Sequence, residues 1–300
     1  MSDKTYRLAL VLEGGAVRGI YTAGVLDVLM KHGVQADMVI GTSAGCIHGC
    51  NYVSGQAGRS IRYYRKYRRD RHFMGLYSLL TSGDMVGRKF CYEDLPTRLD
   101  PFDEAAFEAS PVDFYVTVTN VETGRAEHIL CDDLRVGGKM DLLRAGASMP
   151  LCSRIVTYHG RRYLDGGVAD SVPYRAARQL GARRCLVVLT QPAGYLKRDS
   201  SLLPFQVMYR RYPRFLAAMA DRPAVYNAQV VEVEVEQAAG RGEAFLIRPS
   251  RDTGITRMER DPAVIDEQYA LGRADAETAW PALRRWLQAP VHTDEAAPAI

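Results

Sequence analysis

The chain has 300 residues, of which 47% are hydrophobic and 25% charged, and its formal net charge is +4. This composition is typical of a soluble globular protein with ample material for a sizeable core. The charge is too small to indicate a nucleic-acid-binding protein, and we expect no nucleic acid among its partners.

The beginning of the chain carries no visible targeting signal. Residues 1–5 lead directly into a strand-like run, without the basic segment and apolar stretch of a signal peptide. No apolar run approaches the roughly 20 residues that span a bilayer. We therefore expect a cytoplasmic protein whose six cysteines are reduced thiols, mostly buried. The sequence leaves the oligomeric state open.

Apolar runs alternate with helical patterns along the chain, which indicates βαβ units and a mostly parallel sheet. The apolar runs predict strands at residues 6–12, 38–40, 114–119, 162–164, 185–189 and 244–248. The helical patterns predict helices at residues 18–31, 44–54, 174–180 and 263–287.

One segment gives two conflicting signals. Val231, Val233 and Val235 alternate with glutamates, which is the period of a strand. Both flanks of this segment have helical patterns, and Gly240 would end such a helix. We interpret the segment as a helix.

No linker justifies a division of the chain, so we predict a single domain over residues 1–300. Its core covers about residues 6–192, and a C-terminal helical extension follows over about 195–288. We expect the polar residues 289–300 to form a frayed tail. Within the extension, we expect residues 195–224 to form a mobile cover.

A candidate nucleophile follows the second predicted strand. Gly41-Thr42-Ser43-Ala44-Gly45 satisfies the G-x-S-x-G pattern, in which glycines permit a sharp strand-to-helix turn that projects the serine. Ser43 would also lie at a helix N-terminus, where backbone N–H groups and the helix dipole favour developing negative charge. Taken alone, the motif is equally typical of a helix-capping turn. The strand before it and the helix after it favour catalysis.

The loop Gly14-Gly15-Ala16-Val17-Arg18-Gly19 follows the first predicted strand and permits three interpretations. A Walker loop is excluded, because Ile20 follows where Lys is required. A dinucleotide-binding loop needs glycine at position 16 and an acidic residue at the end of the second strand, whereas Asp37 precedes that strand. The third interpretation is an oxyanion hole, in which the N–H groups of Gly15 and Ala16 bind the reacting carbonyl oxygen. Alanine keeps its N–H, so this chemistry survives if the φ angle of Ala16 is negative.

Asp165-Gly166-Gly167 directly follows the predicted strand at 162–164 and supplies a carboxylate base. An exposed aspartate with a pKa of about 4 is a weak base toward a serine hydroxyl. Asp165 therefore needs a partly desolvated site that raises its basicity, together with strong stabilisation of the oxyanion. The two glycines would let the carboxylate approach Ser43 closely. Without the other motifs, an Asp-Gly-Gly turn would be the simpler explanation.

Histidine is poorly placed for a Ser–His–Asp triad. His159 precedes Asp165, which breaks the α/β-hydrolase order of the three residues. His292 lies in the polar tail. We interpret both as solvated surface histidines.

A metal site is equally unsupported by the sequence. Cys46, His48 and Cys50 lie close together on one predicted helix, but no further ligand at zinc-like spacing is nearby. We interpret these residues as part of a packed core helix and expect no metal.

In this order and at these intervals, the three motifs resemble those of the patatin-like phospholipases, over about residues 8–192. The resemblance implies a three-layer α/β/α sandwich with a mostly parallel central sheet, and a Ser–Asp dyad that hydrolyses acyl esters without histidine or a cofactor. It makes Ser43 the nucleophile and Asp165 the general base. It assigns the oxyanion loop to Gly14, Gly15, Ala16 and Gly19, with supporting roles for Arg18, Gly41, Gly45, Gly166 and Gly167. Ala16 departs from the family, which usually has glycine there. Arg18 is the family's usual basic residue, although it could equally form a structural salt bridge.

Two segments are dense in arginine and tyrosine, at residues 59–73 and 208–215. On helices they would form basic faces suited to anionic headgroups and a peripheral membrane contact. The alternative is a solvated helix whose arginines extend over the edge of the core, which we favour. Single-stranded RNA is bound by similar residues, but neither segment matches a recognised module.

These observations predict a serine acyl-ester hydrolase of the phospholipase A type, acting on a lipid or related carboxylic ester. A non-catalytic lipid- or acyl-binding protein on the same fold is the alternative. A nucleotide-binding protein is a weaker third possibility. Headgroup, acyl length and positional preference do not follow from the sequence.

Overall fold

The computed structural model describes residues 4–199 and 201–290. Eight strands in this part of the chain form one sheet. They are β1 (Ala9–Leu12), β2 (Met38–Thr42), β3 (Asp113–Asn120), β4 (Ala126–Leu130), β5 (Val156–Tyr158), β6 (Arg161–Asp165), β7 (Cys185–Val188) and β8 (Ala244–Ile247). Their order is β5-β6-β3-β2-β1-β7-β8, with β4 paired to β3 outside this path.

The sheet is mostly parallel, as the alternation of strands and helices predicts. Strands β3, β2, β1, β7 and β8 run parallel to their neighbours, whereas β4 and β6 pair with β3 in antiparallel fashion and β5 with β6. The parallel strands are connected by helices, because a crossover between parallel strands needs a long connection.

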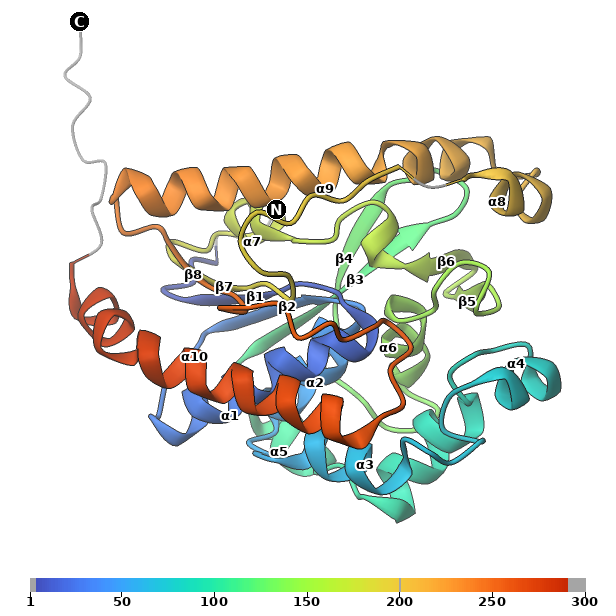
Figure 1. Ribbon diagram of the computed structural model, residues 1–300, viewed down its shortest axis with the longest axis horizontal. Coiled ribbons are helices and arrows are strands. Elements are labelled where there is room, and N and C mark those ends of the chain that lie inside the picture. Colours follow the sequence, from blue (N-terminus) through green and yellow to red (C-terminus); the bar gives the residue numbers. More distant parts are fainter. Residues whose placement is uncertain (1–3, 200, 291–300) are drawn as a thin grey trace, which may run out of the picture.

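Helices cover both faces of the sheet. The α-helices are α1 (Ile20–Lys31), α2 (Ala44–Val53), α3 (Arg59–Tyr67), α4 (Leu76–Ser82), α5 (Glu104–Ala109), α6 (Met140–Gly146), α7 (Tyr174–Gln179), α8 (Leu203–Met208), α9 (Pro213–Ala239) and α10 (Pro262–Gln288). Two 3₁₀ turns, η1 (Ala16–Gly19) and η3 (Gly166–Val168), and one π-helical segment, η2 (Phe90–Leu99), complete the set. In Figure 1, α7 and α9 lie above the sheet and α1, α2 and α10 lie below it. The three-layer α/β/α sandwich is confirmed.

Each central strand is buried on both faces, which explains its continuous apolar sequence. Every residue of β1 is fully buried. Leu10 and Leu12 belong to the hydrophobic cluster between the sheet and helices α1 and α10. Ala9 and Val11 belong to the cluster between the sheet and helices α7 and α9. Alternate side chains of one strand therefore build two separate cores.

The predicted first strand and first helix are each too long at their N-terminal ends. Tyr6 forms only an isolated bridge with Ala182, and the continuous strand begins at Ala9. The chain after the glycine loop makes the tight turn η1 before the α-helix begins at Ile20. Glycine-rich backbone favours such a turn over an immediate α-helix.

The ambiguous valine–glutamate segment lies within the long helix α9, so its interpretation as a helix is confirmed. Tyr226, Val230 and Val233 are buried at helical spacing against the sheet. Val231 and Val235 are 53% and 58% exposed, so the period of two in the sequence does not describe which side chains face the core.

Besides α9, a strand and a helix attach the C-terminal segment to the core. Strand β8 pairs with β7, and α10 packs along α1. A Cβ atom at Gly24 would collide with the Tyr269 carbonyl, and one at Gly272 with the Tyr21 carbonyl, so the two helix backbones touch directly. The single-domain assignment stays a prediction, as does the mobility of residues 195–224. Within the described residues, no helix combines the length and the apolar character that crossing a bilayer requires.

Candidate active site

Ser43 lies in a sharp turn between β2 and α2. Its backbone has φ 54° and ψ −121°, a conformation that L-residues rarely adopt. Two glycines make the turn possible, because a Cβ at Gly41 would lie 2.6 Å from the Gly45 carbonyl carbon and one at Gly45 would collide with the Leu12 carbonyl. The turn holds Ser43 at the N-terminus of α2, as the G-x-S-x-G pattern predicts.

Asp165 reaches Ser43 because both flank strand β3. Thr42 is paired with Thr117 on one side of β3, and Asp165 with Val118 on the other. The Ser43 Oγ donates a hydrogen bond to the Asp165 Oδ2 at 2.6 Å. These two side chains, 122 residues apart in the sequence, thus form a direct hydroxyl–carboxylate pair.

The Asp165 carboxylate is buried, with 5% of the residue exposed. Burial raises the pKa of Asp165, and the hydrogen bonds from Ser43 and from the Gly167 N–H oppose this effect. The Gly167 N–H donates to the Asp165 Oδ1 at 2.7 Å and fixes its orientation. Gly166 is needed for a different reason. A Cβ at this position would collide with the Thr117 carbonyl of β3.

The glycine-rich loop lies directly against the serine. A Cβ at Gly14 would lie 3.0 Å from the Ser43 Cβ. The Gly14 N–H donates to the Ser171 carbonyl at 3.4 Å, whereas the N–H groups of Gly15 and Ala16 have no acceptor among the described residues. Two backbone donors beside a buried hydroxyl are what an oxyanion hole requires. Gly19 lies one turn further on, where a Cβ would be 2.5 Å from that of Ala44.

The φ angle of Ala16 is 51°, so the negative angle that the sequence analysis set as a condition for its oxyanion role is not observed. The tight entry into η1 places this residue in the left-handed region, which costs an L-residue roughly 1–2 kcal/mol. The amide N–H is retained at this position. The alanine therefore carries backbone strain that glycine would not.

None of the other residues considered from the sequence competes for Ser43. His159 is exposed in the turn between β5 and β6, and His292 lies outside the described residues. The Nδ1 of His48 is 2.9 Å from the Ser60 Oγ, and burial lowers the pKa of His48 to about 3. Cys46 donates its S–H to the Gly41 carbonyl. Within the described chain, no cluster of metal-ligating side chains forms around these residues.

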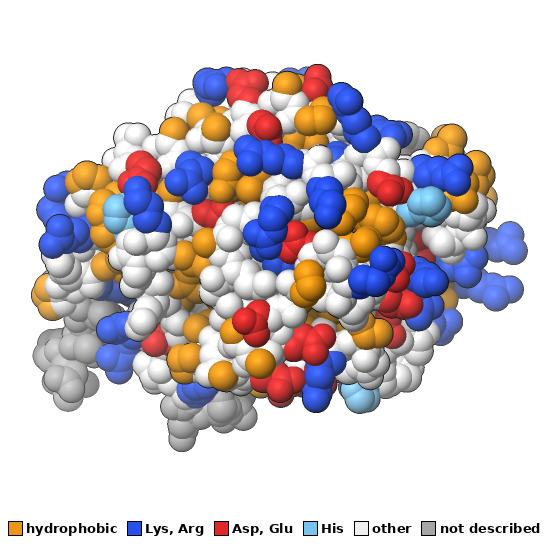
Figure 2. All heavy atoms as spheres, turned by 90° about the horizontal axis from the view of Figure 1, so that it is seen from below, with side chains coloured by type: hydrophobic (Ala, Val, Ile, Leu, Met, Phe, Trp, Pro, Cys, Tyr) orange, Lys and Arg blue, Asp and Glu red, His pale blue; other side chains and the backbone are white. Residues whose placement is uncertain are grey.

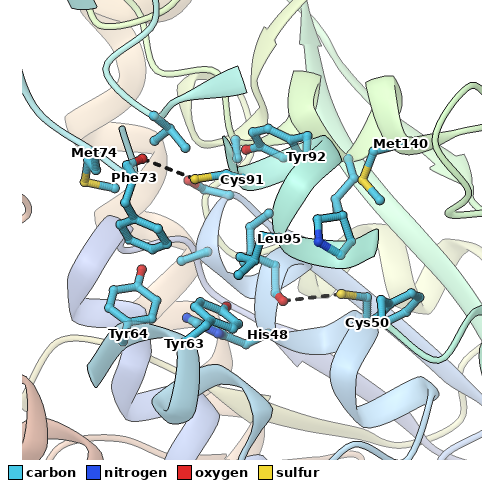
Figure 3. A pocket seen from close by; sticks show the side chains of 18 of the residues that line it. His48, Cys50, Tyr63, Tyr64, Phe73, Met74, Cys91, Tyr92, Leu95 and Met140 are labelled. Atoms are coloured by element: carbon cyan, nitrogen blue, oxygen red, sulfur yellow. Dashed lines mark hydrogen bonds between the residues drawn. The ribbon is translucent and has the colours of Figure 1, made fainter. Parts of the chain in front are cut away.

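An apolar cavity of about 900 Å³ opens from Ser43 toward α3 and η2. Figure 3 shows aromatic and sulfur-containing side chains lining it, among them Tyr64, Phe73, Tyr92 and Met140. The cavity matches the hydrocarbon chain of a lipid in polarity.

A second cavity of about 1030 Å³ opens on the other side of Ser43 and is much more polar. It is lined by charged side chains from separate parts of the chain, namely Glu13, Arg18, Asp165, Lys197, Arg222 and Arg257. Ala16, Ser43 and Met149 line both cavities. The hydroxyl thus lies where an apolar and a cationic compartment meet.

Arg18 lines the polar cavity and forms no surface salt bridge within the described residues. Its guanidinium nitrogens lie 2.8 and 3.1 Å from the Gln191 side-chain oxygen, with that amide oriented toward it. The buried Glu13 is nearby and accepts from the Thr190 N–H. Arg18 therefore extends from η1 toward the cavity rather than toward the Ser43 hydroxyl.

The sequence analysis missed Glu13, Lys197, Arg222 and Arg257. Glu13 directly precedes the glycine-rich loop, and a charged residue after a buried strand was a usable signal. The three basic residues lie in separate C-terminal segments without any motif. Only the fold brings them together.

Three arginines of the segment 59–73 make contacts within the protein, and a role of this segment at a lipid surface stays a prediction. Arg59 donates to the Asp100 carbonyl at 2.6 Å, Arg62 pairs with the Asp100 carboxylate at 2.7 Å, and Arg68 donates to the Met258 carbonyl at 2.9 Å. Figure 2 shows the molecule from below relative to Figure 1, and on this face basic side chains are interspersed with acidic and hydrophobic ones. These arginines anchor α3 to its neighbours.

A comparison with known protein families shows to which family this chain belongs. The model of the patatin-like phospholipase family matches residues 10–178, which include both Ser43 and Asp165. The chain is a member of the patatin-like phospholipase family. Membership of this family supports lipid hydrolase activity. A second model, for a domain of unknown function (DUF6363), matches residues 212–288.

Individual relatives of this patatin-like protein share 26–28% of their residues with it. The uncharacterized protein YjjU of Escherichia coli K12 is 28% identical over 281 residues, covering 89% of this chain and 75% of its own. The lysophospholipases NTE1 of Debaryomyces hansenii and Aspergillus niger are each 26% identical, covering 94% and 96% of this chain. This chain spans only 18% and 19% of their length. The solved structure of VipD from Legionella pneumophila covers 94% of this chain and 68% of its own, with a TM-score of 0.46 and 11% identity.

Proposed function

We propose that this protein hydrolyses a carboxylic ester of a lipid with a Ser43–Asp165 dyad. The observation that carries the proposal is the 2.6 Å hydrogen bond from the Ser43 Oγ to the Asp165 Oδ2. That bond lies beside the unpaired N–H groups of Gly15 and Ala16 and at the junction of an apolar and a polar cavity.

The reaction follows from these contacts. Asp165 accepts the Ser43 proton as the Oγ attacks the ester carbonyl, and the N–H groups of Gly15 and Ala16 bind the oxyanion. Asp165 then returns its proton to the departing alcohol. In the second half, Asp165 removes a proton from water, which attacks the acyl-enzyme, and Asp165 then returns this proton to the Ser43 Oγ as the fatty acid is released. Protein side chains and amides suffice for each step.

The two cavities favour an orientation for the substrate. The acyl chain lies in the apolar cavity beneath α3 and η2, and the alcohol portion lies in the polar cavity. Relatives are named lysophospholipases, and a lysophospholipid carries a single acyl chain. A single chain suits the one apolar cavity that opens at Ser43 within the described structure.

We further propose a peripheral contact with a lipid surface through α4 and α8. Both short helices project from the right-hand side of Figure 1 and expose large apolar side chains. Leu80 of α4 is 77% exposed and Val207 of α8 is 75% exposed. Exposed apolar residues on protruding elements favour insertion into the boundary of a bilayer.

The two helices are joined to the mouth of the polar cavity. The Met85 N–H, just after α4, donates to the Cys152 carbonyl at 2.6 Å, and the Leu151 N–H donates to the Tyr209 hydroxyl, just after α8, at 3.0 Å. Leu151 and Cys152 line the cavity itself. The proposed contact with a lipid surface is therefore linked to the cavity that contains Ser43.

Hydrolysis of p-nitrophenyl octanoate by purified protein tests the dyad. We expect Ser43→Ala and Asp165→Asn each to lower kcat by at least about 1000-fold. The exposed Asp221→Asn serves as the matched control and should retain full activity. Substantial activity in Asp165→Asn would refute Asp165 as the base. Lipid binding without turnover in the wild type would favour the non-catalytic alternative.

A further inference from the structure

The polar cavity beside Ser43 carries an excess of positive charge. Four basic side chains line it, namely Arg18, Lys197, Arg222 and Arg257, against two carboxylates, Glu13 and Asp165. Both carboxylates are already engaged, since Asp165 accepts from Ser43 and Glu13 accepts from the Thr190 N–H. None of the four basic residues forms a salt bridge with any carboxylate of the described chain.

Local hydrogen bonds hold these basic residues in place, through the backbone for Lys197 and Arg257 and through the side chain for Arg222. Asn227 binds Lys197 twice, accepting from its N–H at 2.9 Å and donating to its carbonyl at 3.0 Å. The Arg257 carbonyl accepts from the Val17 N–H at 3.2 Å. The Arg222 guanidinium donates to the Gly167 carbonyl. Each residue is thus tied to the catalytic loops or to α9.

Lys197 shows how unfavourable this arrangement is without an anion. Its Nζ lies 4.0 Å from the centre of the Tyr226 ring, and Lys197 forms no salt bridge within the described chain. Burial, together with the neighbouring Arg222 and Arg257, lowers the pKa of Lys197 to about 7, while Glu13 opposes this effect. Like charges gathered in a partly buried cavity are costly unless an anion binds between them.

We propose that Lys197, Arg222 and Arg257 form an anion subsite that binds a phosphate on the alcohol portion of the ester. The inference rests on the proposed function, because it takes Ser43 as the point of attack. Guanidinium groups bind phosphate through paired N–H donors, and a lysine adds a point charge. A phosphate monoester carries a charge of about −1.5 to −2, which matches the excess in the cavity.

The geometry then selects a class of substrate. The apolar cavity on one side of Ser43 takes one acyl chain, and the subsite on the other side takes the phosphate. The substrate is therefore a single-chain ester with a phosphate on its alcohol, such as a 1-acylglycerol 3-phosphate.

This subsite gives the C-terminal segment a function. Arg222 lies on α9 and Arg257 lies between β8 and α10, both within residues 212–288, which match the domain of unknown function. The N-terminal part of the chain supplies Ser43, Asp165 and the oxyanion loop. The C-terminal part recognises the leaving alcohol.

A matched pair of substrates tests the subsite. 1-Octanoylglycerol and 1-octanoylglycerol 3-phosphate share the scissile ester and differ only in the phosphate. We expect the wild type to prefer the phosphate, and Lys197→Gln/Arg257→Gln to lose on the order of 10- to 100-fold in kcat/KM toward it. The same double variant should lose much less in kcat/KM toward 1-octanoylglycerol, so that its preference for the phosphate falls.

The control double variant is Arg198→Gln/Arg260→Gln. It removes the same charge from neighbouring exposed positions outside the cavity and should leave both rates unchanged. An equal loss on both substrates in Lys197→Gln/Arg257→Gln, or no preference for phosphate in the wild type, would overturn the subsite.

Binding to the Ser43→Ala protein separates the subsite from the dyad. Calorimetric titration should show 1-octanoylglycerol 3-phosphate binding at least 10-fold more tightly to Ser43→Ala than to Ser43→Ala with the Lys197 and Arg257 changes. This result would hold even if the wild type proved inert as a hydrolase. Equal affinity for inorganic phosphate and the acylated phosphate would overturn the assignment to a lipid. Unchanged affinity in the triple variant would overturn the subsite itself.

Discussion

At the scale of single residues, the site depends on a carboxylate whose basicity is raised by its surroundings. Asp165 is buried at the end of β6, and burial raises its pKa above the ordinary value of an aspartate. A stronger base accepts the Ser43 proton more readily, provided that it remains ionised at the working pH. Arg222 and Arg257 favour the ionised form and so lower the pKa of Asp165.

The pH dependence of kcat/KM follows from these shifts. Asp165 must be ionised to act, so activity should fall as the pH drops through its raised pKa, above the ordinary value of about 4. Arg222→Gln removes a charge that lowers this pKa, so its acid limb should move to higher pH. A pH profile with the neutral p-nitrophenyl octanoate checks this. The control Arg211→Gln, at an exposed position, should leave the acid limb of the profile unchanged. A shift of the acid limb to lower pH in Arg222→Gln would contradict the account.

The strain at Ala16 predicts a gain in stability on replacement by glycine. Ala16 has a φ angle of 51°, and glycine adopts this region without the steric cost. We expect Ala16→Gly to raise the free energy of unfolding by about 1 kcal/mol and to preserve hydrolysis. Urea denaturation measures the change. At the exposed helical Ala270, the same substitution should lower stability by about 1 kcal/mol. A loss at Ala16 would show that the alanine methyl group is required.

At the scale of elements, the strand–turn–helix around Ser43 could be predicted, because buried strands and glycine turns are marked locally. The partnership of Ser43 with Asp165 could be inferred only through family resemblance. In the structure, Ser43 and Asp165 meet because β2 and β6 both pair with β3. No local sequence pattern predicts that these two strands share a neighbour.

The elements missed by prediction lie mainly between residues 59 and 158. Helix α3 is amphipathic but short and dominated by arginine and tyrosine, and η2 contains Pro96, so neither is marked as a helix by a run of apolar residues. Tertiary contacts stabilise both, as the burial of Arg59 and its bond to Asp100 show. These elements form the wall of the apolar cavity, so the sequence could not predict this cavity either.

The crossing of α1 and α10 predicts a specific intolerance. Gly272→Ala gains about 1 kcal/mol of helix propensity but drives a methyl group into the Tyr21 carbonyl. Overpacking costs typically 1–3 kcal/mol, and here backbone cannot yield as a side chain would. We expect a net destabilisation of about 1–2 kcal/mol by urea denaturation.

The control for Gly272→Ala is Thr278→Ala on the exposed face of the same helix, which should stabilise by a few tenths of a kcal/mol. Equal gains in both variants would mean that the helices do not touch as described.

At the scale of the whole molecule, the fold class could be predicted from the alternation of strands and helices, but the polar cavity could not. Its four basic residues come from four segments that lie far apart in the sequence, three of them in the C-terminal part of the chain. No local pattern marks Lys197, Arg222 or Arg257, because each is a basic residue in an ordinary polar sequence.

The protruding helices predict a vesicle-binding surface. Leu80→Ser/Val207→Ser removes apolar area from α4 and α8, and we expect it to weaken co-sedimentation with anionic vesicles several-fold. Hydrolysis of monomeric p-nitrophenyl octanoate should be unchanged. Val231→Ser/Val235→Ser, on the exposed face of α9, serves as the control and should bind vesicles normally. Equal weakening in both would exclude a specific role for α4 and α8.

The central claim is that Asp165 activates Ser43. The most direct measurement is the rate of reaction with a fluorophosphonate, with the labelled residue located by tandem mass spectrometry. We expect the wild type to be labelled at Ser43, and Asp165→Asn to fold normally but react at least about 100-fold more slowly. Labelling at another serine, or equal rates in Asp165→Asn and the wild type, would contradict the account.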